Sequence, residues 1–195
     1  MLTKRAVGYH GTTQPLARQI LESGFQASQH RGDWLGYGAY FWQDSINMAA
    51  QWARGRKEFR GYLGPLVLIE AEIDLSHSLD LFDIHWMETV EKLSQKFISQ
   101  LRKNRATLKN DTVTGEHQLD CAFFNFVIAY SRQRGFHFTS VRAPCFAGQP
   151  LFENSPISTR GHVQISVVKP SIISQVSVIA EQPVQGTTWK RGYHS

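Results

Sequence analysis

The order in which strand-like and helix-like stretches follow one another constrains the fold of this chain most. Helix-like periodicity fills much of the first two thirds of the sequence, and strand-like stretches bracket it. The expected strands cover residues 5–10, 65–73, 136–141, 162–168 and 172–180. A regular alternation of strand and helix, which would indicate a parallel sheet, is not seen. The pattern therefore predicts an α+β fold.

Four helices are expected between these strands. Pro15 favours the first turn of a helix, and Gly24 is placed to end it. A second helix is expected after residue 44. Apolar side chains recur every three or four residues from Ile84 to Leu101, which predicts an amphipathic helix, and residues 119–134 form the fourth helical stretch.

Composition limits the class of protein. A chain of 195 residues with 42% hydrophobic residues is expected to form one domain with its own core. The longest apolar runs, such as residues 66–69, are far shorter than the roughly 20 residues that span a bilayer. No apolar segment follows the basic residues at the N-terminus, which argues against a secretory signal. We therefore expect a cytoplasmic protein without a membrane partner.

The cysteines and histidines do not indicate a metal centre. Cys121 and Cys145 are too few for a disulfide framework or a four-cysteine zinc site. The histidines show no metal-ligand spacing with them. No bound metal is expected from the sequence.

The charge balance favours a polyanionic partner. The formal net charge is +5, and the sequence pI is about 9.4. Lysines and arginines that neutralise phosphates release counterions, so a basic surface promotes nucleic acid binding. The polar segment 102–116 reads as a mobile loop that is basic over residues 102–109. A second group of cations consists of Arg54, Arg56, Lys57 and Arg60. A merely solvated basic face is the alternative interpretation.

Three short motifs carry candidate chemistry. The first is His10-Gly11-Thr12 at the end of a strand, and the second is Gly38-Ala39-Tyr40-Phe41, with its tyrosine thirty residues after the histidine. The third is the late strand 162–168, on which Gln164 shares a face with the histidine two residues before it. Taken singly, each motif has a purely structural interpretation as a turn histidine, a packed aromatic cluster or a solvated strand face.

Together these motifs resemble the H-Y-E class of ADP-ribosyltransferases, which includes the poly(ADP-ribose) polymerases and diphtheria-like toxins. The segment from Tyr9 to Ala53 is most similar to compact bacterial and phage-defence toxins of this class. The resemblance implies two packed, mainly antiparallel sheets that form a cleft for NAD, with helices around them. It also implies one domain over residues 1–181 with a helical insertion at about 83–134, followed by a polar tail over 182–195.

The resemblance also implies roles for individual residues. His10 would bind the adenosine ribose, the backbone of Gly11 would bind the nicotinamide amide, and Tyr40 would stack on the nicotinamide ring. Trp52 would either close the pocket or pack in the core. The complete set expected at the NAD site is His10, Gly11, Thr12, Gly38, Tyr40, Phe41 and Trp52.

The sequence departs from the family pattern at the catalytic carboxylate. Gln164 occupies the usual glutamate position on the late strand, and glutamine carries no negative charge and does not act as a base. Ala147, in the expected loop 142–148, stands where related toxins carry a glutamate. Glu153 is the competing carboxylate if its loop folds back. Loss of one such group typically costs about 3–4 kcal/mol of barrier stabilisation, so this chain is expected to turn over weakly.

The expected function is therefore an NAD-dependent mono-ADP-ribosyltransferase with NAD as co-substrate. The resemblance implies the toxin of a toxin–antitoxin or antiviral defence system, with an antitoxin as partner. The acceptor is a nucleic acid, with RNA favoured, or a protein. The alternatives are an NAD glycohydrolase and a catalytically dead module that binds NAD or ADP-ribose. A ribonuclease using His10 and His162 is disfavoured. The enzyme interpretations require that His10 and Tyr40 line opposite walls of one crevice.

Overall fold

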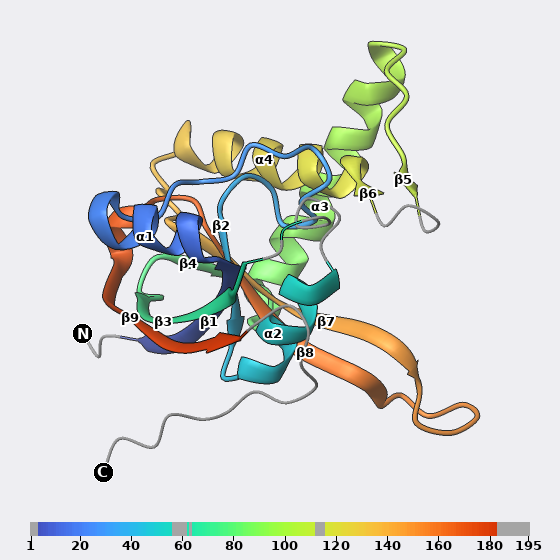
Figure 1. The fold of residues 1–195 in the computed structure, drawn as a ribbon. Coiled ribbons are helices and arrows are strands. Elements are labelled where there is room, and N and C mark those ends of the chain that lie inside the picture. The colour runs from blue at the N-terminus through green and yellow to red at the C-terminus, as the bar shows by residue number, and fades with distance from the viewer. Residues whose placement is uncertain (1–3, 56–61, 63, 112–115, 183–195) are drawn as a thin grey trace.

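The chain folds into a mixture of helices and strands. The computed structural model describes residues 4–55, 62, 64–111 and 116–182. Within these ranges it contains four α-helices, a seven-stranded sheet and a small two-stranded sheet (Figure 1). The α+β class predicted from the sequence is confirmed. In the same ranges no helix is long and apolar enough to cross a membrane.

Helices and strands follow one another without a regular alternation. They are β1 (Arg5–Thr13), α1 (Gln14–Ser23), β2 (Ala39–Gln43), α2 (Ile46–Gly55), β3 (Leu66–Asp74), β4 (Ser78–Asp80), α3 (Ile84–Lys103), β5 (Asn110–Asp111), β6 (Glu116–His117), α4 (Gln118–Arg132), β7 (Ser140–Pro150), β8 (Ser158–Val167), the 3-10 turn η2 (Pro170–Ile172) and β9 (Ile173–Gln182).

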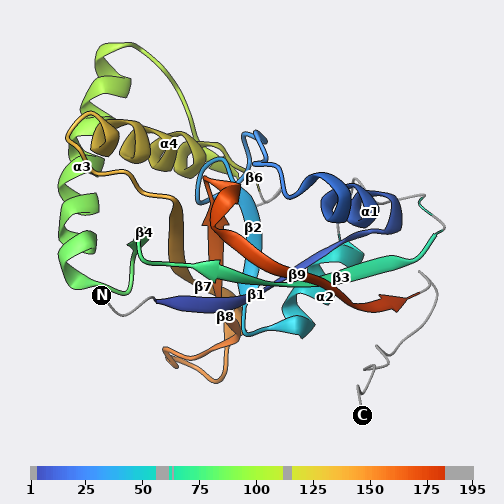
Figure 2. The same ribbon diagram turned by 90° about the vertical axis from the view of Figure 1, so that its left-hand side faces the viewer.

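The large sheet has the strand order β4-β7-β8-β2-β1-β3-β9. Neighbouring strands are antiparallel except for β4 and β7, which are parallel. Strands β1 and β2 are joined by only two registered pairs, Gly8 with Gln43 and Tyr9 with Trp42. Figure 2 shows β1, β3 and β9 running across the direction of β2, β7 and β8. The large sheet is thus one curled sheet whose two halves meet at this narrow seam, and not the two separate packed sheets that were expected.

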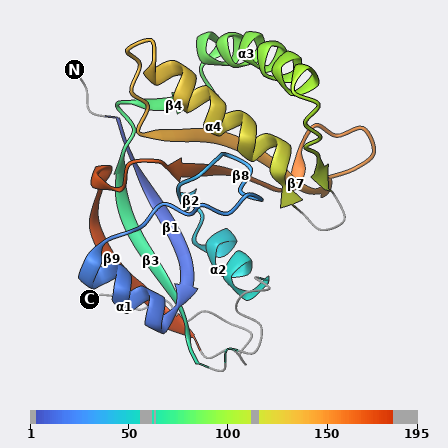
Figure 3. The ribbon, with the colours of Figure 1, turned by 90° about the horizontal axis from the view of Figure 1, so that it is seen from above.

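The helices pack on different parts of the sheet. Helix α1 packs on β1, β3 and β9, whereas α2 packs on β1, β2 and β3. Helices α3 and α4 lie beside each other over the β4–β7 end (Figure 3). Apolar clusters form around Phe41 and Ile69, around Leu79 and Val127, and around Trp42. The first and third of these clusters contain residues from strands of both halves, so the core continues across the seam.

The helix boundaries follow from local chemistry. Helix α1 has Pro15 in its first turn, and Gly24 follows it at a φ of 78°, as the sequence predicts. Asp83 caps α3, because its side chain accepts a hydrogen bond from the His85 N–H at 2.9 Å. The helix then continues through Arg102 and Lys103. These two cations are helical, so the prediction that the basic loop begins at residue 102 is wrong.

Two strands are longer than predicted and change the setting of a candidate residue. Strand β7 begins at Ser140 and continues to Pro150, so the expected loop 142–148 is a strand and Ala147 lies within it. Strand β8 begins at Ser158, four residues before the predicted start. Strand β9 includes residue 182, which the sequence assigns to the tail. The remaining tail residues 183–195 and the cations Arg56, Lys57 and Arg60 lie outside the described residues.

Candidate functional site

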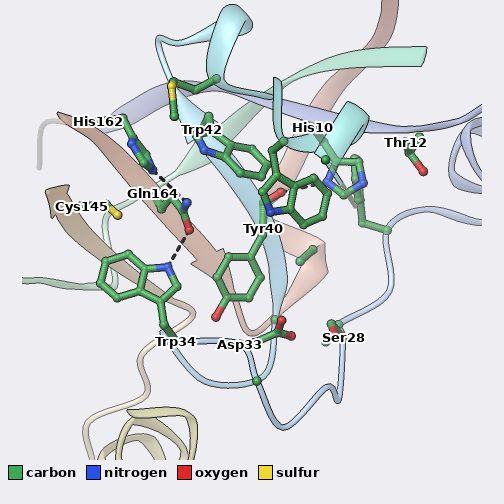
Figure 4. A pocket seen from close by; sticks show the side chains of 18 of the residues that line it. His10, Thr12, Ser28, Asp33, Trp34, Tyr40, Trp42, Cys145, His162 and Gln164 are labelled. Atoms are coloured by element: carbon green, nitrogen blue, oxygen red, sulfur yellow. Dashed lines mark hydrogen bonds between the residues drawn. The ribbon is translucent and has the colours of Figure 1, made fainter. Parts of the chain in front are cut away.

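A cavity of about 1060 Å³ opens over the seam between the two halves of the sheet (Figure 4). Strands β1, β2, β7 and β8, helix α2 and the segment 24–34 contribute to its wall. The predicted site residues that line it are His10, Thr12, Gly38, Tyr40, Trp52, Ala147 and Gln164. Gly11, Phe41 and Glu153 do not line it. The fold therefore brings together most of the residues that the sequence singles out.

The register of the strands places the polar side chains on one face. Tyr40 of β2 lies opposite Ser166 of β8, and Trp42 lies opposite Gln164. Residues directly opposite each other in an antiparallel pair point to the same side of the sheet. Tyr40, Trp42 and Gln164 consequently share the cavity face, although Gln164 is more than 120 residues away along the chain.

His10 stands where β1 and β2 separate. Its Nδ1 atom lies 2.9 Å from the main-chain oxygen of Tyr40, just beyond the last registered pair of the seam. A carbonyl oxygen only accepts hydrogen bonds, so Nδ1 carries the hydrogen and Nε2 is the acceptor of the neutral ring. The ring packs edge-on against Phe25 at 5.3 Å between centroids and at 5.8 Å from Phe41. Phe41 is fully buried and supports the histidine from behind.

His10 and Tyr40 therefore do not line opposite walls. They lie on neighbouring strands of the same sheet and are joined by the imidazole–carbonyl hydrogen bond. Both side chains nevertheless contribute to the same cavity. The two side chains therefore share one cavity, as expected. They line it from adjacent strands, and residues of α2 and of the segment 24–34 line other parts of it.

The hydroxyl group of Tyr40 is held by the backbone of the segment before β2. It accepts a hydrogen bond from the Leu35 N–H at 2.8 Å and donates one to the Gly36 carbonyl at 2.8 Å. Burial raises the pKa of the phenol far above its ordinary value, and the nearby Asp33 carboxylate raises it further. The phenol stays protonated and does not act as a base. What Tyr40 offers to a ligand is its aromatic ring.

Helix α4 braces the segment that holds this hydroxyl. The Asn125 Oδ1 atom accepts a hydrogen bond from the Tyr37 N–H at 2.9 Å. Gly36 adopts a φ of 81°, and a Cβ at this position would lie 2.9 Å from the same Asn125 oxygen. The Cys121 thiol lies 3.6 Å from the His30 carbonyl oxygen. One part of the expected insertion thus supports the wall of the cavity.

The two motif glycines are required by packing. A Cβ on Gly38 would lie 2.2 Å from Ser166 Oγ, because β2 and β8 approach closely there. A Cβ on Gly11 would lie 2.5 Å from the Ala49 carbonyl oxygen and 2.7 Å from Ala53 Cβ. The space that a side chain of residue 11 would occupy is therefore filled by helix α2, so this close packing itself requires a glycine. That close approach brings Trp52 to the cavity, where it packs on Trp42 at 4.9 Å between centroids.

A chain of three hydrogen bonds holds Gln164. The Trp34 indole Nε1–H donates to Gln164 Oε1 at 2.7 Å, and Gln164 Nε2 lies 3.0 Å from His162 Nε2 (Figure 4). His162 Nδ1 lies 2.7 Å from the Arg160 carbonyl oxygen. Gln164 is itself nine per cent exposed. The residue in the expected glutamate position is thus held at both ends of its amide.

The two other carboxylate positions differ in their relation to the cavity. Ala147 lines it and lies opposite Arg160 in the β7–β8 pair. Arg160 and Gln164 are separated by four residues of β8, which corresponds to about 13 Å along a strand. Glu153 is exposed in the turn that ends the projecting β7–β8 hairpin (Figure 1) and does not line the cavity. The suggestion that its loop folds back into the site is not supported.

Several cavity residues were missed by sequence reasoning. Trp34, Trp42 and His162 line the cavity, and so do Asp33 and Cys145. The sequence analysis places His162 on the same strand face as Gln164 but assigns it no role at the NAD site. The contribution of Trp34 depends on a contact across 130 residues and has no local signal.

The remaining chemistry of the wall is limited. Burial raises the pKa of the Cys145 thiol, so this cysteine is a thiol at neutral pH and not a thiolate nucleophile. In the part of the chain that the structure describes, no group of three or more histidines, cysteines and acidic residues is placed to hold a metal ion.

Comparison with protein-family models and with curated proteins gives no match for this sequence. The function is therefore argued from the residues and geometry of the cavity.

Proposed function

We propose that this chain binds NAD in the cavity over the seam and is an NAD-dependent mono-ADP-ribosyltransferase. One observation carries the proposal: the side chains of His10 and Tyr40 line one cavity, and the His10 Nδ1 atom lies 2.9 Å from the main-chain oxygen of Tyr40. These are the residues that the resemblance to the H-Y-E class assigns to the adenosine ribose and the nicotinamide. Their contact across thirty positions is not required by either local motif.

The size of the cavity supports a ligand as large as a dinucleotide. Pockets for small molecules usually measure about 300–1,000 Å³, so a cavity of about 1060 Å³ stands at the upper end. Its wall combines aromatic rings with hydroxyl, amide and imidazole groups, and such polar groups can orient a bound ligand.

The side chains present suit the parts of NAD. Cleavage of the bond between nicotinamide and ribose develops positive charge on the sugar, so the ligand has to be held rigidly. The ring of Tyr40 is held in place by its engaged hydroxyl and offers a face on which nicotinamide stacks. The neutral imidazole of His10 carries its acceptor at Nε2, and a ribose hydroxyl is a suitable donor to such an atom.

The arrangement of the strands around the cavity supports this proposal. Two groups of strands cross at a seam with few pairs, and the cavity opens at that seam. We infer that this arrangement is the NAD cleft of an ADP-ribosyltransferase fold, in which the two halves of the curled sheet take the place of the two expected sheets.

Weak catalysis is part of the proposal. Gln164 supplies no charge, Ala147 supplies no carboxylate, and Glu153 lies away from the cavity. A glutamate introduced at position 147 would stand opposite Arg160, near the outer end of the cavity. Gln164 lies about 13 Å from this point along β8, so Gln164→Glu would place a negative charge in a different part of the cavity.

The acceptor is proposed to be a nucleic acid, with RNA favoured over DNA, or a protein. The net charge of +5 and the exposed cations at residues 102, 103, 105 and 109 support a polyanion. Action as the toxin of a toxin–antitoxin or antiviral defence system, restrained by an antitoxin in the cytoplasm, follows from the resemblance and remains part of the same proposal. An NAD glycohydrolase differs from it only in using water as acceptor.

A catalytically dead module that binds NAD or ADP-ribose is the second candidate. One observation favours it: both ends of the Gln164 amide are held by hydrogen bonds, in a position where transferases of the class carry a carboxylate. A site with this residue retains ligand binding without a base.

The first test is calorimetric titration with NAD. Replacement Tyr40→Ala should weaken binding at least tenfold, whereas Tyr37→Ala, three residues away and outside the cavity wall, should leave it unchanged. Equal binding by both variants would contradict the assignment of the cavity.

The second test concerns the reaction. The Ala147→Glu form is incubated with labelled NAD and with separate RNA, DNA and protein fractions. Label in one fraction identifies a transferase and its acceptor class, whereas free ADP-ribose without labelled acceptor identifies a glycohydrolase. Binding of NAD without consumption, in both the Ala147→Glu and Gln164→Glu forms, would identify the binding module.

A further inference from the structure

The hydrogen bonds around Gln164 leave only one arrangement of protons. An indole N–H only donates, so the atom of Gln164 that faces Trp34 must be the amide oxygen. The amide nitrogen then faces His162 and donates to its Nε2. The Arg160 carbonyl oxygen only accepts, so His162 carries its hydrogen on Nδ1.

These three assignments agree with one another. Nδ1 is the donor and Nε2 the acceptor in one of the two tautomers of a neutral imidazole. If His162 were protonated, its Nε2–H would face the N–H of Gln164, and two donors would oppose each other. The same opposition would arise if the amide were reversed, because its nitrogen would then face the indole donor.

From this network we propose that neutral His162 is the positioning residue of the NAD site: it holds the Gln164 amide with its oxygen towards Trp34 and one N–H towards the cavity. This rests on the proposed function for the identity of the ligand. The amide nitrogen has two hydrogens, of which His162 accepts one. The second is a donor at the cavity wall, and it suits an oxygen acceptor such as a hydroxyl group of NAD.

The surroundings of His162 contain few other groups that change charge. Cys145 lies directly opposite it on β7, Arg160 and Gln164 flank it on β8, and Trp34 approaches from the loop. Among the described residues of the cavity wall, the one carboxylate is that of Asp33, and the other imidazoles are those of His10 and His117. The pH response of His162 must therefore be separated from that of these imidazoles by substitution.

The proton arrangement is tested without any ligand. In protein labelled with ¹⁵N in histidine, long-range ¹H–¹⁵N spectra at pH 8 should show His162 protonated at Nδ1 and bare at Nε2. The indole Nε1–H signal of Trp34 should shift in His162→Phe and return towards the wild-type position in His162→Gln, whose side-chain oxygen replaces the acceptor. The Nε2–H tautomer would overturn the proposal.

The effect on binding is tested by calorimetry with NAD at pH 8 and at pH 5.5. We expect the wild-type affinity to fall about five- to tenfold more than that of His162→Gln as the pH is lowered, which corresponds to loss of one oriented hydrogen bond. His162→Phe should bind weakly at both pH values. Parallel pH profiles for wild type and His162→Gln would overturn the positioning role.

A double-mutant cycle separates positioning from general support of the fold. If His162 acts through the amide, His162→Phe should lower NAD affinity in the wild-type background and have no further effect in Gln164→Leu. Additive losses would contradict the proposal. If the tautomer is the expected one and no form binds NAD, the proposed function fails while the orientation of Gln164 by His162 stands.

Discussion

The Nδ1 atom of His10 lies 2.9 Å from the main-chain oxygen of Tyr40, at the point where strands β1 and β2 part. A side chain here makes the hydrogen bond that a longer strand pair would have supplied from its backbone. This contact ties the first motif of the sequence to the second. It also joins the two halves of the sheet beneath the cavity.

Substitution of His10 should separate this structural contact from ligand binding. His10→Phe removes the donor to the Tyr40 carbonyl and should lower the free energy of unfolding by about 1–3 kcal/mol. His10→Asn retains an N–H close to the position of Nδ1 and should lose less. Both should weaken NAD binding, because neither has an acceptor at the place of Nε2. Urea denaturation and calorimetry measure the two effects, and equal stability losses would argue against the bond.

Tyr40 should make the fold sensitive to alkali. Its folded pKa lies above the ordinary value of 10.0, chiefly through burial and then through Asp33. Above pH 10 the unfolded chain loses this proton while the folded chain keeps it, so the free energy of unfolding should fall with rising pH. The slope from one proton is at most about 1.4 kcal/mol per pH unit. Below pH 10 this group contributes no pH dependence.

The measurement for this prediction is urea denaturation of wild type and Tyr40→Phe between pH 8 and pH 11. The variant should be less stable at pH 8, because Leu35 N–H and Gly36 C=O lose their partner, and its additional alkaline loss should be smaller. Tyr37→Phe, on the same segment, should follow the wild type. Identical alkaline slopes for wild type and Tyr40→Phe would show that the phenol is not buried.

Gly38→Ala should destabilise the fold through overpacking between β2 and β8. The new methyl group would meet Ser166 Oγ at 2.2 Å and the Val167 carbonyl oxygen at 3.0 Å, at a cost of about 1–3 kcal/mol in the free energy of unfolding. The double substitution Gly38→Ala with Ser166→Ala removes the closer contact and should recover part of this loss. Without such recovery, the strain would have to lie elsewhere.

Gly11→Ala should move helix α2 away from β1. The methyl group would meet the Ala49 carbonyl oxygen at 2.5 Å, and backbone does not yield as a flexible side chain would. We expect a loss of about 1–3 kcal/mol in unfolding free energy and a changed near-ultraviolet circular dichroism signal from Trp42 and Trp52. Gly55→Ala in the same helix has no atom within 4 Å of its new methyl group and serves as the control. If Gly11→Ala left both the stability and the circular dichroism signal unchanged, α2 would not pack on β1 as closely as described.

Asn125→Ala should weaken the support that helix α4 gives to the cavity wall. It removes the acceptor for the Tyr37 N–H, close to the turn that holds the Tyr40 hydroxyl. The expected loss in unfolding free energy is about 1 kcal/mol, with a measurable decrease in NAD affinity. Ser94→Ala on the exposed part of α3, away from the cavity wall, is the control. Unaltered affinity in Asn125→Ala would mean that the helix does not act on the site.

Much of the fold was predictable because its signals are local. Pro15 and Gly24 mark the bounds of α1, and the spacing of apolar residues from Ile84 to Leu101 marks α3. Such signals depend on the few neighbouring residues that share a helical turn. The extent of β7 was not predictable, because residues 142–150 are extended through pairing with β8 and carry two prolines that favour a loop interpretation.

The sequence by itself determined the α+β class, most helices and the two residues, His10 and Tyr40, that identify the candidate site. Only the tertiary structure decided how the site works: the narrow seam, the packing of α2 on Gly11, and the chain from Trp34 through Gln164 to His162. The physical reason is the distance along the chain between the residues that interact. Helix propensity and apolar periodicity act within a few residues, whereas the direction of a hydrogen bond depends on partners that only strand register brings together.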